Sequence, residues 1–76
     1  MAQLRDNIAI SILAKNVRRH RLIKNMTQEG LANAAGIEYS QVSRIERGLL
    51  NTSISVVFAI AAALQTSPSK LLEDEQ

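Results

Sequence analysis

The chain has 76 residues, of which 46% are hydrophobic and 21% are charged, and its formal net charge is +2 at pH 7. This length allows a single domain (1–76) with a thin core, and the composition excludes a disordered tail. The lack of cysteine excludes disulfide frameworks, thiolate metal sites and thiol catalysis. No apolar run reaches the roughly 18 to 20 residues of a membrane span. We therefore expect a small soluble domain in the cytoplasm.

Apolar residues at three- and four-residue spacing predict helices along the whole chain. A first helix is expected from near Asp6, a good N-cap residue, to about Lys24. Thr27 is expected to cap a short second helix over 28–35, which Gly36 ends.

The second half of the chain predicts three further helices. Glu38 begins a third helix that ends at Gly48, although a glutamate is an imperfect N-cap. Ser53 caps a fourth helix, and Ser67 followed by Pro68 opens a last short helix. Five helices with short connections predict a compact all-α domain.

Basic residues are concentrated in the middle of the chain. Between positions 15 and 47 there are seven Lys or Arg residues and three Glu residues, whereas Glu73, Asp74 and Glu75 make the C-terminus acidic. A basic middle favours a polyanionic partner, and a solvated surface of mixed charge is the alternative.

The stretch most informative about function covers about residues 27–48, where two short helices meet at a sharp turn. Gly36 can adopt the positive φ that such a turn needs, and Ala32 is small enough for the helices to approach closely. Apolar side chains of this stretch are expected to pack inward. The outward face of the third helix then consists of Tyr39, Ser40, Ser43, Arg44 and Arg47. A small, polar and basic helix face suits the major groove of DNA.

Four segments of the sequence carry a family resemblance and together span roughly residues 13–72. They are MTQEGLA, AAGIEYSQVSRIERG, NTSISVVFAIAAAL and SPSKLL. On these motifs the chain resembles the Xre and lambda-repressor/Cro-type helix-turn-helix proteins, which include the controller proteins of restriction–modification systems. The resemblance implies a lambda-repressor-like fold of five helices and a transcriptional regulator that binds double-stranded DNA sequence-specifically.

The resemblance also implies roles for particular residues. The recognition helix (39–47) would enter the major groove and bring its outward side chains to base edges or adjacent phosphates. Phosphate contacts are expected from Gln28, Asn51, Thr52, Arg18 and Arg19. Glu38 is expected to be a tolerated imperfect cap, and a contact with cytosine is the alternative.

Arg21 and Glu46 are interpreted separately, because the family often joins these two positions by an ion pair between the first and third helices. This pair is expected to order the fold without touching DNA. His20 is expected to be partly packed rather than a metal ligand or a general base.

The fourth helix departs from the family pattern because its outer face carries no charged residue. A helix that is apolar nearly all round is expected to be buried all round. We therefore predict a homodimer that binds an inverted repeat, with dimerisation elements over about 49–72. Its interface residues are expected to be Leu49, Leu50, Val56, Ala59, Ala62 and Leu71. An alanine-rich surface without a partner is the alternative.

Two other functional classes are less compatible with the sequence. Ile8 and Ile12 form a second apolar strip, which would suit a protein-interaction module such as the antitoxin of a toxin–antitoxin pair. An enzyme is not expected, because one histidine and scattered carboxylates provide no catalytic residues, no metal site and no cofactor site. The operator sequence, the choice between repressor and activator, and the phage, restriction–modification or antitoxin context stay open at this point.

Overall fold

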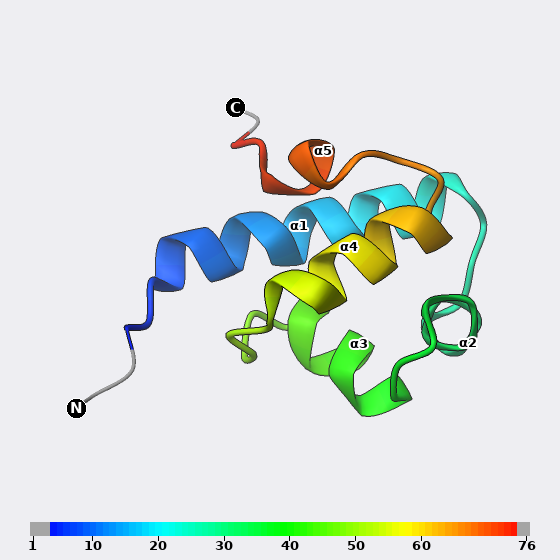
Figure 1. Cartoon of the computed structure of the whole chain (residues 1–76), viewed down its shortest axis with the longest axis horizontal. Helices are drawn as coiled ribbons and strands as arrows, with labels where there is room; N and C mark the ends of the chain where they lie inside the picture. Colours follow the sequence, from blue (N-terminus) through cyan, green and yellow to red (C-terminus); the bar gives the residue numbers. More distant parts are fainter. Residues whose placement is uncertain (1–3, 75–76) are drawn as a thin grey trace.

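The computed structural model describes residues 4–74, so Glu75 of the predicted acidic C-terminus lies outside the described residues. The helices are α1 (Asn7–Ile23), α2 (Gln28–Ala35), α3 (Tyr39–Glu46), α4 (Ile54–Ala63) and α5 (Pro68–Leu72), as Figure 1 shows. No strand occurs within residues 4–74. The expected all-α architecture of five helices is confirmed.

Short polar side chains begin three of the helices, as their sequence positions predict. Asp6 Oδ1 accepts hydrogen bonds from two first-turn N–H groups of α1, both at 3.0 Å. Thr27 Oγ1 caps α2 with a bond of 2.9 Å, and Ser53 Oγ caps α4 with a bond of 3.2 Å. Because first-turn N–H groups have no partner inside the helix, each cap stabilises its helix by about 0.5–2 kcal/mol.

The start of α3 is closed in a different way. Glu38 occupies the N-cap position with an extended backbone. Its own N–H donates to Gln41 Oε1 at 3.1 Å, so the side chain in the first turn reaches back to the cap residue. The imperfect cap at Glu38 was predicted from the sequence, but this contribution from Gln41 was not.

One hydrophobic core receives side chains from all five helices. Its largest fully buried side chains are Val17, Leu31, Val42, Ile45, Ile60, Leu64 and Leu71. Complete burial of each such side chain contributes about 1.5–3 kcal/mol of transfer free energy. The core therefore fixes the positions of α2 and α3 relative to α1 and α4.

Leu71 belongs to this core and not to the molecular surface. Its exposed fraction is 0%, and α5 packs against both α1 and α4. A helix of five residues can cover the core only by turning its few apolar side chains inward. The prediction that Leu71 lies in a dimer interface is therefore wrong.

α4 is less buried than its apolar composition predicts. Val57, Ile60 and Ala61 are buried, but Ile54 is 69% exposed and Phe58 is 58% exposed. In a domain this small, a helix at the edge of the core has neighbours on one side only. The single chain thus leaves one side of α4 at the surface, and burial of that side stays a prediction for the homodimer.

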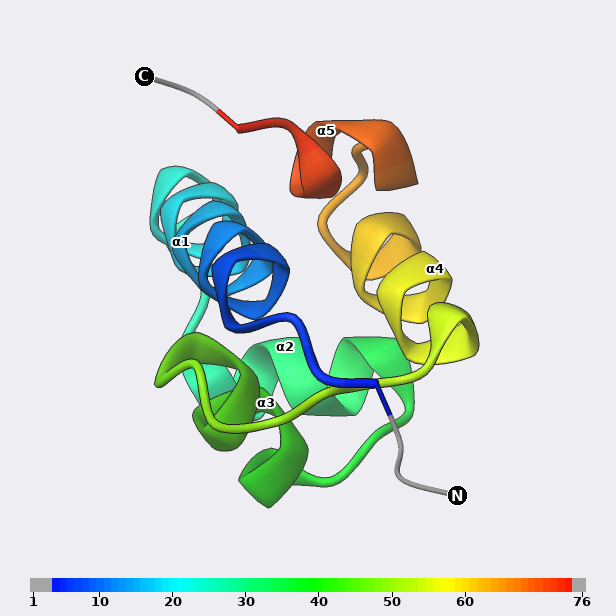
Figure 2. The same ribbon diagram turned by 90° about the vertical axis from the view of Figure 1, so that its left-hand side faces the viewer.

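α2 and α3 together form one end of the molecule. In Figure 2, α1 and α4 stand on either side of the core, α5 lies above them, and α2 and α3 lie below. α3 packs against α1 and α2, whereas α2 packs against α3 and α4. The side of α3 that faces away from these neighbours is left at the surface.

Candidate nucleic-acid interface

The turn between α2 and α3 requires a residue in the left-handed conformation. Gly36 has a φ of 71° and a ψ of 33°, which would cost an L side chain about 1–3 kcal/mol. The N–H of Ile37 donates to Ala32 O at 3.0 Å and closes the end of α2. Glycine is needed here because it adopts this positive φ without strain. The turn fixes the direction in which α3 leaves α2.

α3 presents one apolar side and one polar side. Val42 and Ile45 are buried and face the core. Tyr39 is 51% exposed, and the rest of the outward set is exposed or half-buried: Ser40, Ser43, Arg44 and Arg47. The side chains expected to recognise DNA thus lie together on the solvent-facing side of one helix.

Most of these outward side chains are not engaged by the rest of the protein. Within the described part of the chain, Tyr39, Ser40 and Arg44 form no side-chain hydrogen bond or ion pair. Arg47 Nε donates to Ser43 O at 3.4 Å, a long contact along the helix. The Arg44 guanidinium keeps its donors available, and such a group can bind guanine O6 and N7 in a bidentate manner.

Arg21 and Glu46 connect α1 to the end of α3 through a bidentate ion pair. Arg21 Nε lies 2.6 Å from Glu46 Oε2, and Arg21 Nη2 lies 2.9 Å from Glu46 Oε1. The Glu46 side chain is 3% exposed and the Arg21 side chain is 11% exposed. Hydrogen bonding to this carboxylate raises the pKa of the Arg21 guanidinium above its ordinary value, because it stabilises the charged form.

Gln28 reaches the same carboxylate from the first position of α2. Its Nε2 donates to Glu46 Oε1 at 3.1 Å, and Arg21 Nη1 donates to Met26 O at 2.8 Å. Glu46 therefore holds together the C-terminal part of α1, the start of α2 and the end of α3. The half-buried Gln28 amide has two hydrogens, so one is left for an outside acceptor such as a phosphate.

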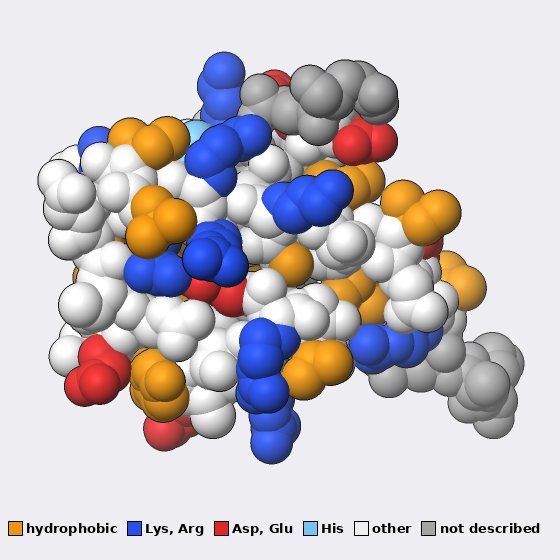
Figure 3. Space-filling model, turned by 180° about the vertical axis from the view of Figure 1, so that it is seen from behind, with side chains coloured by type: hydrophobic (Ala, Val, Ile, Leu, Met, Phe, Trp, Pro, Cys, Tyr) orange, Lys and Arg blue, Asp and Glu red, His pale blue; other side chains and the backbone are white. Residues whose placement is uncertain are grey.

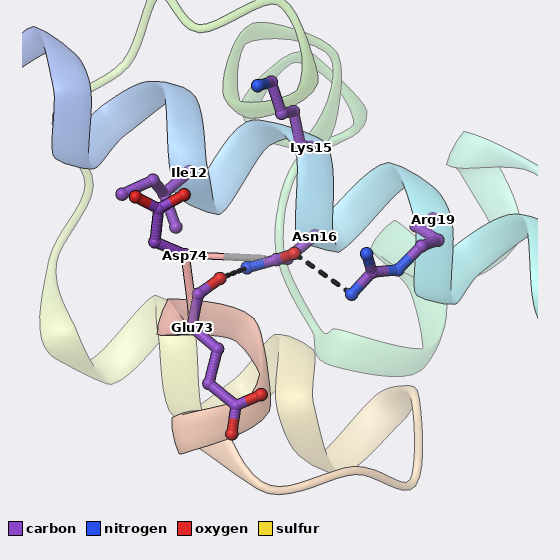
Figure 4. Close-up of a pocket in the computed structure, with 6 residues that line it drawn as sticks. All are labelled: Ile12, Lys15, Asn16, Arg19, Glu73 and Asp74. Carbon is purple, nitrogen blue, oxygen red and sulfur yellow. Dashed lines mark hydrogen bonds between the residues drawn. The ribbon is translucent and has the colours of Figure 1, made fainter. Parts of the chain in front are cut away.

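Arg18 and Arg19 lie on different sides of α1. Because each residue turns an α-helix by about 100°, Arg18 lies about 60° and Arg19 about 160° from Arg21 around the helix axis. Figure 4 shows Arg19 beside Asn16, whose Oδ1 accepts from Arg19 Nη2 at 3.2 Å. The structure thus leaves Arg18 on the α3 side and does not bring Arg19 together with the other predicted DNA-binding residues.

The apolar strip expected on the outer side of α1 is only partly exposed. Ile8 is 74% exposed, whereas Ile12 is half-buried at a cavity of about 40 Å³ beside Glu73 and Asp74 (Figure 4). Asn16 Nδ2 holds this C-terminal segment by donating to Glu73 O at 2.8 Å. Ile8 and Ile12 lie one helical turn apart, and the strip is open to solvent at Ile8 and partly covered at Ile12.

Asn51 and Thr52 lie in the connection between α3 and α4, against the segment that precedes α1. Asn51 Nδ2 donates to Leu4 O at 3.0 Å, and Arg5 Nη2 donates to Leu49 O at 3.3 Å. Arg5 was not predicted from the sequence, since no local spacing indicates a contact between residues 44 positions apart. A lone arginine just before a helix cap was its only signal.

Basic side chains are spread over one face of the molecule. Figure 3 shows several Lys and Arg side chains across the face seen from behind, with acidic side chains mainly near its margins. The exposed basic residues of α1 and α3 are Lys15, Arg18, Arg19 and Arg44, and the exposed Arg47 is the C-cap residue of α3. Such an uneven distribution attracts a polyanion from a distance.

His20 is half-buried on α1 and titrates abnormally. Partial burial, together with the positive charges of Arg19, Lys70 and Lys24, lowers its pKa below the ordinary value of 6.5, and Glu73 opposes this only in part. The unfolded chain, with the ordinary pKa, binds more protons than the folded chain between the folded pKa and 6.5. The stability that the neutral imidazole provides is therefore lost as the pH falls through this window.

We expect the melting temperature to decrease when the pH is lowered from about 7 to about 5.5, and we expect His20→Gln to reduce this dependence. Thermal denaturation followed by circular dichroism at both pH values measures the difference. An equal decrease in the two proteins would show that other groups cause it.

Two further properties bear on the class of site. Among residues 4–74, no group of three or more His, Asp or Glu side chains could hold a metal ion. Over the same range, no helix has both the length and the apolar character needed to cross a bilayer.

Comparison with known proteins agrees with this geometry. The family model described as "Helix-turn-helix" matches residues 17–71. The chain belongs to the helix-turn-helix family. This helix-turn-helix protein is 43% identical over 61 residues to control protein C.SmaI of Serratia marcescens, a match that covers 80% of the chain and 73% of C.SmaI. The resemblance inferred from the sequence motifs is thus confirmed.

Solved structures extend the likeness to the whole fold. The hypothetical transcription factor NHTF from Neisseria has a TM-score of 0.87 and 35% identity, and the match covers 100% of this chain and 88% of that one. The restriction–modification controller protein C.AhdI from Aeromonas hydrophila has a TM-score of 0.79 and 32% identity, with coverage of 82% and 94%. The helix-turn-helix protein therefore has the lambda-repressor-like fold that the resemblance implied. In sequence it spans only 58% of the full length of the Neisseria protein.

Proposed function

We propose that this helix-turn-helix protein is a sequence-specific transcriptional regulator that binds an inverted-repeat operator in double-stranded DNA as a homodimer. The outward side of α3 carries the proposal, because its polar and basic side chains face solvent and remain largely unengaged. A helix of this kind fits the major groove, where Arg44 would read a base edge.

Phosphate contacts on either side of α3 would set its register on the duplex. Gln28 stands at the start of α2, where the helix dipole favours an anion, and its amide is oriented by Glu46. Arg18 and Asn51 lie exposed on α1 and on the connection after α3. Contacts of this type position a protein on DNA without specifying the sequence.

The dimer surface that we propose is centred on α4. Ile54, Phe58 and Ala62 follow one another at four-residue spacing, are all exposed, and form what we call the α4 stripe. Val57 of this helix also lines a mostly apolar groove of about 150 Å³, together with Leu50 and Leu72 and with the polar side chains of Asn51 and Thr52. Large exposed apolar side chains next to such a groove are typical of an interface.

The α4 stripe revises the interface that the sequence predicts. Leu50 and Val56 are half-buried and pack against the core, so they contribute less surface than expected. Leu49 and Ala62 are exposed and are retained, and Ala59 is half-buried. Ile54 and Phe58 were not predicted as interface residues, because their spacing is equally compatible with a core position.

Selection of bound duplexes from a random DNA pool, at near-physiological salt, tests the proposed function. We expect enrichment of an inverted repeat whose half-site centres lie about 34–36 Å apart, the separation of successive major grooves on one side of the duplex. Weak binding without any enriched sequence, abolished by modest salt, would contradict sequence-specific regulation.

Arg44→Ala is expected to relax the preference at a single base position of the enriched sequence, with a loss of about 1–3 kcal/mol of discrimination. Lys70→Ala, which removes one exposed charge from α5, is the matched control and should leave every base preference unchanged. Repeating the selection with both variants measures the effect. A uniform loss of affinity with unchanged base preferences would instead indicate that Arg44 contacts the backbone.

A further inference from the structure

We propose that Arg5 and Asn51 form an additional phosphate-binding site, which extends the DNA contact beyond the C-terminal end of α3. This inference rests on the proposed DNA-binding function and adds a residue that neither the motifs nor the family match contains, since the matched region begins at residue 17. The partner chemistry is a phosphate of the DNA backbone.

Leu49 links Arg5 to the recognition helix. Its N–H donates to Arg44 O at 2.9 Å, which closes the end of α3, and its carbonyl accepts from Arg5 Nη2 at 3.3 Å. A single residue therefore lies between the Arg5 guanidinium and the backbone of Arg44. A phosphate that flanks the bases read by Arg44 would lie on the same side of the molecule.

The Arg5 guanidinium is oriented but not neutralised. Among the described residues, its other hydrogen-bond acceptor is Asn7 Oδ1, which accepts from Nε at 3.0 Å. Both acceptors are uncharged, and no described carboxylate pairs with Arg5; Asp6 directs its Oδ1 to the first turn of α1. A guanidinium has five N–H donors, so donors remain for an anion, and their direction is already set.

Asn51 supplies a second donor next to this cation. One hydrogen of its amide is bound to Leu4 O, and the other has no acceptor among the described residues. Together the two bonds align the segment before α1 with the connection after α3, and Figure 2 shows them crossing at the end of the molecule that α2 and α3 form. An exposed, uncompensated cation with spare donors at this end is placed to bind the DNA backbone.

The test measures the salt dependence of binding for wild type, Arg5→Gln, Arg5→Lys and Lys70→Gln. Each protein is titrated with the duplex enriched by selection and with a scrambled duplex, between about 50 and 200 mM salt. Arg5→Gln should weaken binding to both duplexes by the same factor, and the slope of log K against log[salt] should fall by about 0.9 for each phosphate that is no longer neutralised. Arg5→Lys should restore most of the slope because it keeps the charge, and Lys70→Gln should match wild type.

A merely structural role for Arg5 gives a different result. If Arg5→Gln weakens binding but leaves the salt slope unchanged, Arg5 only orders the connection and the phosphate site is refuted. The phosphate site is also refuted if Arg5→Gln binds both duplexes like wild type. If wild type binds neither duplex, the proposed function itself fails and this inference with it, so the two failures are distinguishable.

Discussion

Glu46→Gln is expected to destabilise the folded protein by about 3–5 kcal/mol, because it leaves the Arg21 guanidinium without its carboxylate in a nearly buried site. In a domain of this size, 1 kcal/mol changes the melting temperature by about 4–8 °C. The loss is therefore comparable with the total stability of many small domains. Thermal and urea denaturation measure it.

Two variants separate the charge effect from the removal of an ordinary hydrogen bond. Arg21→Met/Glu46→Leu removes both charges and should be more stable than Glu46→Gln alone, since replacing a buried pair by apolar groups is often neutral or stabilising. Gln28→Ala removes only an uncharged donor to this carboxylate, at 3.1 Å, and should cost about 1.5–3 kcal/mol, the range for a hydrogen bond to a charged group and less than for Glu46→Gln. A Glu46→Gln protein with the melting temperature of wild type would refute the role assigned to the pair.

Phe58→Glu is expected to convert the proposed homodimer into monomers and to lower the affinity for the operator by about 10²–10⁴-fold. Phe58 lies in the middle of the α4 stripe, so the substitution places a charge at the centre of an apolar contact. The affinity falls because two linked half-site contacts become two separate binding events. Sedimentation velocity measures the assembly, and titration with the enriched duplex measures the affinity.

Ile8→Glu is the matched control for this variant. It introduces the same charge at another large, exposed apolar side chain, and Ile8 lies on the side of α1 opposite the buried Ile10. We expect Ile8→Glu to remain a dimer with nearly the affinity of wild type. A Phe58→Glu protein that sediments as a dimer would exclude α4 from the interface.

The helices could be predicted closely because their ends depend on local chemistry. Asp6, Thr27 and Ser53 each accept hydrogen bonds from N–H groups within the next three residues. Gly36 ends α2 through a backbone conformation that its own residue type permits. Information of this kind lies within a few positions in the sequence, so no knowledge of the tertiary packing is needed.

Burial could not be predicted as well, because it depends on which helix covers which face. Leu71 and Leu72 are adjacent leucines in a short helix, yet one is fully buried and the other is half exposed. The same uncertainty applies to Ile54 and Phe58, whose spacing suits a core position but whose side of α4 has no neighbour in the single chain. An apolar pattern identifies a face that must be covered and leaves open what covers it.

The candidate site likewise combines features that local sequence predicts with contacts that only the tertiary structure reveals. The outward set on α3 follows from helical spacing, and the family resemblance placed Arg21 opposite Glu46. The third member of that cluster, Gln28, and the contact of Arg5 with Leu49 depend on side chains that meet across 18 and 44 positions. No periodicity in the sequence predicts such contacts between distant residues.

The cluster around Glu46 also has a mechanical consequence. It ties the start of α2 to the end of α3, and these are the two places from which Gln28 and Arg44 would reach the duplex. The cluster therefore holds the distance between the proposed backbone contact of Gln28 and the proposed base contact of Arg44 nearly fixed. If the corresponding distance on the proposed operator differs, the DNA must bend or twist to fit the protein. Half-sites would therefore be selected partly for their flexibility.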